Sequence, residues 1–390
     1  MQMSIMRRGS QWALFVCLLT SFAAAATPQY VLTNDDASVF SIDSVTFYTI
    51  GTGGTLELYK QVSTGGAGIA GGFFGANRLA MLNNGGTQCV YASLAFTGGI
   101  VGIDVSTLEV VGTTYGSATD NGSSNGIGLA INNQYLYASY TGSNTIATFQ
   151  VQPECGLSFV SDVTVIGLQG GFVDGMAISG NTMVATFGDG SIQSFNISSG
   201  TPVSNGDMQN STGAIASGYA SYPTSVEMTQ DGHYAIFGDT STSTLVEVSD
   251  ISSGKLKKTV SYSLGNGINS SNILLSPDET LLYVVNTQGD TLSAAFFNAT
   301  TGKLTPGCIS GSLKGYVSDW SYLGGLSLQT NTGTGNVVYV AEFGTASGIA
   351  MINVTSANGQ CTLLETAGSP ASDPYSTGLL SIGTFPPRTF

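Results

Sequence analysis

The feature that most constrains the fold of this chain is a β-type motif, rich in tyrosine and valine, that recurs along the sequence. It consists of short runs such as Tyr30-Val-Leu-Thr-Asn and Leu282-Tyr-Val-Val-Asn, and successive copies begin about 46 to 60 residues apart. A period of this length is typical of repeat architectures. Seven copies are present, at residues 30–34, 90–93, 136–140, 183–187, 234–238, 282–286 and 338–342. The chain is therefore expected to contain seven similar units.

Each unit contains further candidate strands. A polar turn follows the tyrosine-containing run and leads to a second alternating run, such as residues 145–151, and short glycine turns such as residues 300–304 introduce the next strand. A fourth, apolar run precedes the tyrosine strand in six units, at residues 78–82, 126–131, 175–178, 224–228, 272–276 and 325–328.

The two ends of the chain complete each other. The first unit has no apolar run before its tyrosine strand, whereas residues 377–382 have the matching pattern with no tyrosine strand after them. We therefore predict an all-β fold, a seven-bladed β-propeller with four antiparallel strands per blade, closed by the C-terminal strand joining the first blade. Closure also protects the pairing edges of the terminal blades. The alternatives are a β-helix, which needs a shorter period and no matched termini, or stacked sandwich domains.

Residues 1–26 have the pattern of an export signal. Arg7 and Arg8 precede the apolar run 12–19, and Ala24-Ala25-Ala26 offers the small residues that a signal peptidase recognises. The apolar run is shorter than the roughly 20 residues that a membrane-spanning helix requires, which disfavours the alternative of a membrane anchor. We expect residues 1–26 to be a signal peptide and residues 27–390 to be a single propeller domain of a secreted, extracellular protein without a membrane span.

Cysteine usage agrees with secretion. Removal of the signal takes away Cys17 and leaves four cysteines, which allow two disulfides in any of three pairings. In the blade register above, two of them fall in neighbouring blades 2 and 3 and the other two in blades 6 and 7. The register predicts the pairs Cys89–Cys155 and Cys308–Cys361.

Asn-x-Ser/Thr sequons mark candidate glycosylation sites. Roughly five would arise by chance in a chain so rich in Ser and Thr, so their use would follow from secretion through a eukaryotic pathway and not from their number. We expect three to end third strands and three to lie on loops near one face. The first three are Asn196, Asn298 and Asn353, and the others are Asn121, Asn210 and Asn269.

The charge balance excludes several partner classes. The chain has 10 Lys+Arg against 24 Asp+Glu, a net charge of −14, so it lacks the basic surface that nucleic-acid binding requires. One histidine cannot form a His-rich zinc site, and no EF-hand-like spacing appears, although calcium on acidic loops is chemically reasonable. We expect no cofactor, no protein metal site, a monomer, and a small-molecule ligand in the central channel, with cell-wall or matrix components as further partners.

One stretch carries a family resemblance. Residues 276–286, Ser-Pro-Asp-Glu-Thr-Leu-Leu-Tyr-Val-Val-Asn, and the following run 291–305 resemble the blade consensus of the seven-bladed lactonase family. That family includes 6-phosphogluconolactonases and fungal 3-carboxymuconate cyclases. The resemblance spans residues 30–385, but its motif specifies packing and turns more strongly than chemistry.

In propellers of this kind the ligand face is formed by loops entering the inner strands and loops joining the second and third strands. The entering loops hold Arg78, our candidate anion anchor, and Asp174, our candidate acid or base. The candidate ligand-binding residues are Asn125, Tyr222, Asn272, Tyr322 and Tyr375. The other loops contribute Asp35, Asp36, Asn144, Asp189, Asp239, Asn286 and Glu342, although turns favour such residues whatever the function.

The resemblance leaves two functions open. Lactonising members use a His, a Glu and arginines near the channel, whereas this chain has one histidine, His233, expected in a turn on the opposite face, and only Arg78 and Arg388 after the signal. The first hypothesis is a lactonase-like enzyme acting on a sugar-acid or muconate-type lactone, with a degenerate family active site. The second is a non-catalytic extracellular propeller, serving as a surface antigen, an adhesin or a carbohydrate- or ligand-binding module.

Overall fold

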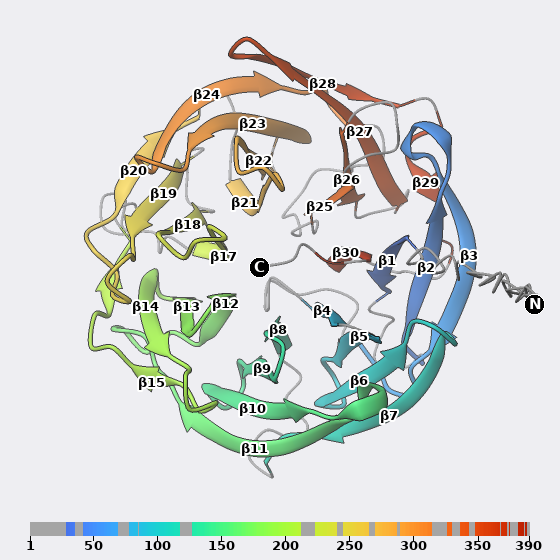
Figure 1. Cartoon of the computed structure of the whole chain (residues 1–390), viewed down its shortest axis with the longest axis vertical. Helices are drawn as coiled ribbons and strands as arrows, with labels where there is room; N and C mark the ends of the chain where they lie inside the picture. The colour runs from blue at the N-terminus through green and yellow to red at the C-terminus, as the bar shows by residue number, and fades with distance from the viewer. Residues whose placement is uncertain are drawn as a thin grey trace, which may run out of the picture.

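The strands of this protein form a ring of seven antiparallel sheets around a central channel (Figure 1). The computed structural model describes residues 29–35, 42–68, 78–84, 86–117, 127–211, 223–239, 245–264, 270–286, 289–313, 326–329, 336–342, 348–366, 368–372, 374, 381–385 and 387. The signal peptide expected at residues 1–26 lies outside these ranges. The predicted seven-bladed all-β fold is confirmed.

Each sheet is one blade, and its strands follow one another from the channel to the outer rim. The inner strands of blades 1 to 7 are β30 (Ser381–Phe385), β4 (Leu79–Asn84), β8 (Ile127–Ile131), β12 (Val173–Ser179), β17 (Pro223–Met228), β21 (Ser270–Leu275) and β25 (Leu326–Gln329). The second strands are β1 (Tyr30–Asn34), β5 (Thr87–Leu94), β9 (Tyr135–Tyr140), β13 (Thr182–Phe187), β18 (Tyr234–Asp239), β22 (Leu281–Asn286) and β26 (Asn336–Glu342).

The third strands are β2 (Ser44–Ile50), β6 (Gly99–Asp104), β10 (Thr145–Val151), β14 (Ser191–Asn196), β19 (Leu245–Asp250), β23 (Thr291–Asn298) and β27 (Gly348–Ala357). The outer strands are β3 (Leu56–Ser63), β7 (Glu109–Tyr115), β11 (Leu157–Thr164), β20 (Val260–Ser263) and β24 (Lys303–Ile309) in blades 1, 2, 3, 5 and 6. In blades 4 and 7 two strands share the outer position, β15 (Val203–Ser204) with β16 (Gln209–Asn210), and β28 (Gln360–Glu365) with β29 (Ala371–Ser372).

The ring closes within blade 1, as the matched ends of the sequence predict. The C-terminal strand β30 pairs antiparallel with β1, in a register that runs from Tyr30 opposite Phe385 to Asn34 opposite Ser381. Blade 1 is therefore built from both ends of the chain, and β30 covers the edge that β1 would otherwise leave unpaired.

The core is divided among the seven contacts between neighbouring blades. Each of seven buried apolar clusters combines residues of two consecutive blades, for example Leu32 and Phe47 of blade 1 with Val90 and Val101 of blade 2. Tyrosines of the second strands cross these contacts, and the Tyr140 hydroxyl of blade 3 donates to the Gly98 carbonyl of blade 2 over 3.1 Å. The recurring tyrosine-valine motif thus supplies the packing between blades.

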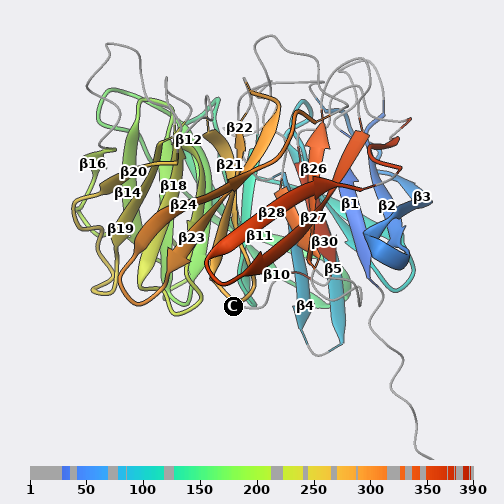
Figure 2. The same ribbon diagram turned by 90° about the horizontal axis from the view of Figure 1, so that it is seen from above.

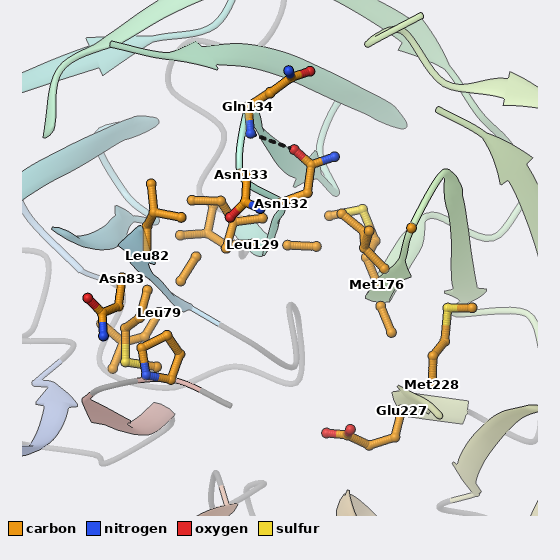
Figure 3. A pocket seen from close by; sticks show the side chains of 18 of the residues that line it. Leu79, Leu82, Asn83, Leu129, Asn132, Asn133, Gln134, Met176, Glu227 and Met228 are labelled. Carbon is orange, nitrogen blue, oxygen red and sulfur yellow. Dashed lines mark hydrogen bonds between the residues drawn. The ribbon is translucent and has the colours of Figure 1, made fainter. Parts of the chain in front are cut away.

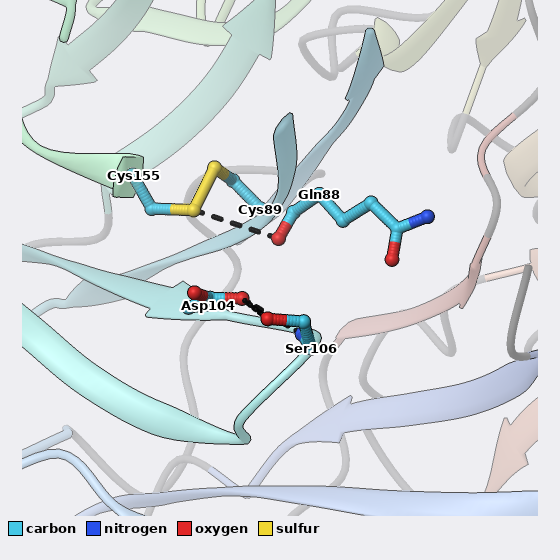
Figure 4. Close-up of a disulfide and its surroundings, with 5 residues drawn as sticks. All are labelled: Gln88, Cys89, Asp104, Ser106 and Cys155. Atoms are coloured by element: carbon cyan, nitrogen blue, oxygen red, sulfur yellow. Dashed lines mark hydrogen bonds between the residues drawn. A yellow bond between two sulfur atoms is a disulfide. The ribbon is translucent and has the colours of Figure 1, made fainter. Parts of the chain in front are cut away.

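Two disulfides join neighbouring blades, with the predicted pairing. Cys89 of β5 bonds Cys155 of the short 3-10 turn η2 (Pro153–Cys155), which links blades 2 and 3 (Figure 4). Cys308 of β24 bonds Cys361 of β28, which links blades 6 and 7. Gly102 lies beside the first bridge, and a side chain there would collide with the Cys155 carbonyl oxygen.

The candidate glycosylation sites fall on different elements. Asn196 and Asn298 end β14 and β23 as predicted and are exposed. Asn353, in contrast, lies within β27 because that strand continues to Ala357, and Asn210 lies in the short strand β16 and not on a loop. Asn121 and Asn269 lie outside the described residues. Among the helices of the described residues, none is long and apolar enough to cross a membrane.

Candidate functional site

The channel has two distinct ends. We call the end where the inner strands begin the mouth, and the end where they turn into the second strands the hairpin end. Figure 2 shows the ring edge-on, with β4 and β5 reaching the hairpin end together. Three predicted site residues are at the mouth. Arg78 immediately precedes β4, and Asp174 and Asn272 lie near the starts of β12 and β21.

Arg78 is held by a set of hydrogen bonds that involves the closing strand. Its backbone N–H donates to the Ser381 hydroxyl of β30 at 2.9 Å, and its carbonyl accepts from the Ser93 N–H of β5 at 3.0 Å. The Asn34 amide, opposite Ser381 in blade 1, donates to the Ser93 carbonyl at 3.1 Å. The Arg78 side chain is 1% exposed. Closure of the ring therefore fixes the position of this arginine.

Asp174 and Asn272 occupy irregular positions of their strands. The pairing of β12 with β13 skips between Val173 and Met176, and that of β21 with β22 skips between Ser270 and Ile273. Interruptions of this kind redirect side chains and are frequent beside active sites. Where the backbone pairing is interrupted, a side-chain hydroxyl accepts in place of a backbone carbonyl, since the Gly175 N–H donates to the Thr186 hydroxyl at 2.8 Å. Asp174 and Asn272 are 3% and 4% exposed.

Asp189 organises the loop that leads to Asp174. Its carboxylate accepts from the backbone N–H groups of Gln169 at 2.6 Å and Gly171 at 3.0 Å, and from the N–H and hydroxyl of Ser191. Burial opposes ionisation of Asp189, but the hydrogen bonds from Ser191, Gln169 and Gly171 outweigh it and hold its pKa below the usual value. Asp189 is thus a structural anion of the mouth.

Other polar residues at the second-to-third strand turns also have structural partners. Asp35 accepts hydrogen bonds from the hydroxyls of Thr33, Ser44 and Thr46, and it is fully buried. The Asn286 amide donates to the hydroxyls of Thr291 at 3.1 Å and Ser293 at 2.8 Å. These contacts support the interpretation that turn geometry, and not ligand binding, selects these two residues.

Asp290 is an acid that the sequence analysis did not select. It lies at the turn between β22 and β23, in the same blade as Asn272, with a φ of 51°. Burial raises the pKa of its carboxyl above the usual value. Aspartates are so common in turns that the sequence offers no signal for this one.

Several predicted residues cannot be compared with the structure. Asn125, Tyr222, Tyr322, Tyr375 and Asp36 lie outside the described residues. His233 is described, in the turn between β17 and β18 at the hairpin end, as expected. Its imidazole is 57% exposed and lies 3.1 Å from the Asp231 carboxylate.

The hairpin end contains a cavity of about 710 Å³ (Figure 3). Its wall is formed by residues of β4, β8, β12, β17 and β21, and includes Met81, Met176 and Met228. Among the described lining residues, Glu227 is the one with a charged side chain. None of the site residues predicted from the sequence lines this cavity within the described part of the chain, and Glu227 gives no signal in the sequence because its strand also contains Thr224 and Ser225. Among the described residues, no three His, Cys, Asp or Glu side chains are grouped as a metal site would require.

The family of this propeller follows from comparison with known protein families. The model of the family described as lactonase, 7-bladed beta-propeller, matches residues 177–375, slightly more than half of the chain. The chain belongs to this lactonase family. A search of curated proteins finds no match to it.

Solved structures agree with the lactonase fold. Proteins provisionally named 6-phosphogluconolactonases from Bacteroides uniformis and Bacteroides fragilis are each 14% identical to the chain, with TM-scores of 0.69 and 0.67. The alignments cover 92% and 93% of this chain and 99% of each neighbour. The periplasmic gluconolactonase of Pseudomonas aeruginosa is 15% identical, with a TM-score of 0.50 over 74% of this chain and 84% of its own. At these identities the likeness establishes the fold alone.

Proposed function

We propose that this lactonase-family chain is a secreted enzyme that opens or closes a small lactone of sugar-acid or muconate type at the mouth. The observation that carries the proposal is Arg78, a fully buried arginine that the closing strand holds at the start of β4. Membership of the lactonase family supports the reaction class, and the names of the structural neighbours support sugar-acid lactones as the substrate class.

Arg78 and Asp174 have separate roles in this proposal. The guanidinium, a planar fork of donors, would bind the carboxylate or the carbonyl oxygen of the lactone and stabilise negative charge developing on that oxygen. Asp174 would take a proton from water as the water oxygen bonds to the carbonyl carbon. The bond between that carbon and the ring oxygen then breaks, and the ring oxygen leaves as a hydroxyl after accepting a proton.

The charge of the chain favours an uncharged substrate. With a net charge of −14, the protein repels doubly anionic ligands at long range and does not concentrate them. An unphosphorylated aldonolactone therefore suits this chain better than a phosphorylated one.

The test is hydrolysis of a panel of aldonolactones by the purified protein in metal-free buffer, followed by acid release. Turnover should fall about 100-fold in Arg78→Met, in the range measured when one oxyanion-stabilising group is removed. Lys258→Met is the matched control, because it removes the same charge from an exposed position. Absence of turnover of every lactone by the wild-type protein would remove the proposal.

The second candidate is a non-catalytic extracellular propeller that binds a glycan or matrix component. The observation that favours it is the exposed position of His233, the single histidine, at the hairpin end. No histidine is thus available at the mouth for family chemistry. Glycan-array binding that persists in Arg78→Met, without lactone turnover, would establish this function instead.

Secretion and glycosylation complete the proposal. The exposed sequons Asn196 and Asn298 are the best candidates for glycan attachment among the described sites. N-terminal sequencing of the exported protein should begin at Thr27, and glycopeptide mapping should find sugars at these two asparagines. An N-terminus that retains the apolar run 12–19 would contradict the export signal.

A further inference from the structure

We propose that Ser93 and Asn34 form a hydroxyl-binding subsite beside Arg78 at the mouth. The inference rests on the proposed function, because it concerns the same site. It assigns to these two side chains, neither of which the sequence analysis selected, the recognition of a hydroxyl group on the lactone ring.

A hydroxyl recurs at the penultimate position of the second strand in three consecutive blades. It belongs to Ser93 in blade 2, Ser139 in blade 3 and Thr186 in blade 4. The Ser139 hydroxyl accepts from the backbone N–H of Gly128, on the inner strand of blade 3, at 3.1 Å. The Thr186 hydroxyl accepts in the same way from the Gly175 N–H of blade 4 at 2.8 Å. In these two blades the hydroxyl therefore binds the backbone of its own inner strand.

Blade 2 departs from this arrangement. The Ser93 N–H donates to the Arg78 carbonyl at 3.0 Å, so Arg78 holds the place opposite Ser93 that Gly128 holds opposite the hydroxyl of blade 3. The Arg78 N–H, however, donates to the Ser381 hydroxyl of blade 1 at 2.9 Å. The Ser93 hydroxyl is left with no hydrogen-bond partner among the described residues, although Ser93 is only 1% exposed.

Asn34 contributes a second atom of the same kind. Its side-chain N–H donates to the Ser93 carbonyl at 3.1 Å, which joins Asn34, Ser93 and Arg78 in one hydrogen-bonded chain. The side-chain oxygen of Asn34 has no partner in the described part of the chain, and the residue is fully buried. Buried polar atoms are nearly always hydrogen-bonded, because an unpaired one loses the bonds that it makes with water. Two such atoms in the chain that holds Arg78 indicate that a bound molecule completes them.

The two atoms together select a hydroxyl group. The side-chain oxygen of Asn34 only accepts hydrogen bonds, whereas the Ser93 hydroxyl both donates and accepts. A ligand hydroxyl can donate its proton to Asn34 and accept the proton of Ser93. A carboxylate, such as that of a muconate-type lactone, has no proton for Asn34, and a methylene group offers neither. The subsite therefore favours a sugar-acid lactone, which has hydroxyls around its ring.

The experiment uses two lactams, because a lactam keeps the ring carbonyl and resists hydrolysis. Gluconolactam has hydroxyls around its six-membered ring, and δ-valerolactam is the same ring without them. Titration calorimetry of the full chain at pH 7 gives both affinities, and we expect gluconolactam to bind at least about tenfold more tightly. Ser93→Ala should weaken gluconolactam binding about tenfold, because one hydrogen bond in a buried site is lost, and should change δ-valerolactam binding less than about twofold.

Ser139→Ala is the matched control. It removes the same hydroxyl from the same strand position in blade 3, where the hydroxyl has its backbone partner, so both affinities should stay unchanged. Asn34→Leu replaces the amide by an apolar side chain of similar size, and it should also weaken gluconolactam binding about tenfold. Thermal melting identifies any variant that does not fold, and either of the two subsite variants is sufficient for the test.

Three results would overturn the inference. They are no binding of either lactam, equal affinity of the wild-type protein for both, which would assign the two buried atoms to an internal water molecule, and unchanged gluconolactam affinity in a folded subsite variant. Binding does not require turnover. A protein that binds gluconolactam through Ser93 but hydrolyses no lactone would keep the subsite and lose the proposed enzyme function, and lactone turnover without an effect of Ser93→Ala would do the reverse.

Discussion

The two ends of one channel differ in almost every property that decides what a site can bind. At the mouth, ionisable side chains such as Arg78 and Asp174 are buried, and backbone N–H groups are bound to hydroxyls of neighbouring strands. At the hairpin end the described wall is largely apolar, with methionines and leucines from several blades, carboxamides at the hairpin turns and the carboxylate of Glu227. Similar repeats therefore produce two chemically different ends, because residues such as Arg78, Asp174 and Asn272 lie before or near the starts of their inner strands, whereas Met81, Met176 and Met228 lie further along theirs.

The rigidity of the two ends differs as well. The mouth is defined by directional bonds, such as those that fix Arg78 to Ser381 and Ser93. The wall of the hairpin end depends on side-chain packing supported from behind by a disulfide, since Cys89 pairs with Leu82 of the cavity wall across β4 and β5. Changes to packing should affect the cavity, and changes to polar groups should affect the mouth.

The largest effect is expected from removal of the disulfide behind the cavity. Cys89→Ser with Cys155→Ser opens a loop of 66 residues, for which chain entropy predicts a loss of about 4 kcal/mol of unfolding free energy. Urea denaturation measures the loss. At temperatures well below the melting temperature of the variant, lactone turnover at the mouth should be retained. Loss of turnover in the folded variant would show that the two ends are not independent.

Arg78→Met should affect only the mouth. Turnover of the best lactone substrate should fall about 100-fold, which corresponds to about 2.7 kcal/mol of transition-state stabilisation. Arg78→Lys keeps the charge but loses the planar fork, so it should recover only part of the activity. Full activity in Arg78→Lys would argue against a bidentate role.

Two glycine substitutions compare the backbone beside the disulfide with the methionine side chain of the cavity wall. A Cβ at Gly102 would collide with the backbone carbonyl of Cys155. Because the disulfide holds that backbone in place, Gly102→Ala should lower the free energy of unfolding by about 2 kcal/mol. A Cβ at Gly383 meets the flexible end of Met81, which can move aside, so Gly383→Ala should cost less than about 1 kcal/mol. Urea denaturation of the two variants gives both values. The opposite order would show that the Met81 side chain cannot move aside.

The smallest effect concerns pH and the mouth. Because the folded-state pKa of Asp189 is depressed, its contribution to stability is present above the ordinary carboxyl pKa and is lost as pH falls through the folded value. Asp189→Asn should be less stable than wild type by about 1 kcal/mol at pH 7, since its amide cannot accept all the N–H groups of the loop. The difference should narrow as pH falls below about 4, where the aspartate of the unfolded chain begins to take up a proton, and should vanish below the lowered folded-state pKa of Asp189. Denaturation at pH 7 and pH 3 tests this, and Asp162→Asn, in the outer strand β11, is the control.

The sequence predicted the fold well because the fold is periodic. A tyrosine such as Tyr283 recurs in the second strand of several blades, where it packs against a neighbouring blade. The same packing position therefore requires the same type of residue several times along the chain. The disulfide pairs followed from the same register. Asn353 shows the limit of the approach, since strand ends depend on how far the neighbouring strand continues.

The candidate functional site could be predicted from the sequence less well than the fold. Asp35, Asp174 and Asp189 look alike as acidic residues beside strand ends, yet hydroxyls surround Asp35, a loop backbone surrounds Asp189, and Asp174 falls in an irregular position of its strand. Which partners an aspartate meets depends on segments distant in the sequence. Glu227 was passed over for the same reason, because only the ring brings its strand into contact with a cavity formed by other blades.

The sequence by itself determined the seven blades, the closure of the ring by a C-terminal strand and the pairing of the cysteines, because each of these repeats or complements a pattern along the chain. It placed the closing strand at residues 377–382, whereas the structure has it at residues 381–385. The tertiary structure alone decided that Arg78 is fixed by Ser381, about 300 residues away, and that methionines of three blades line one cavity. Local patterns specify strands. Convergence of side chains from separate blades is specified only when hydrophobic packing between those blades closes the ring.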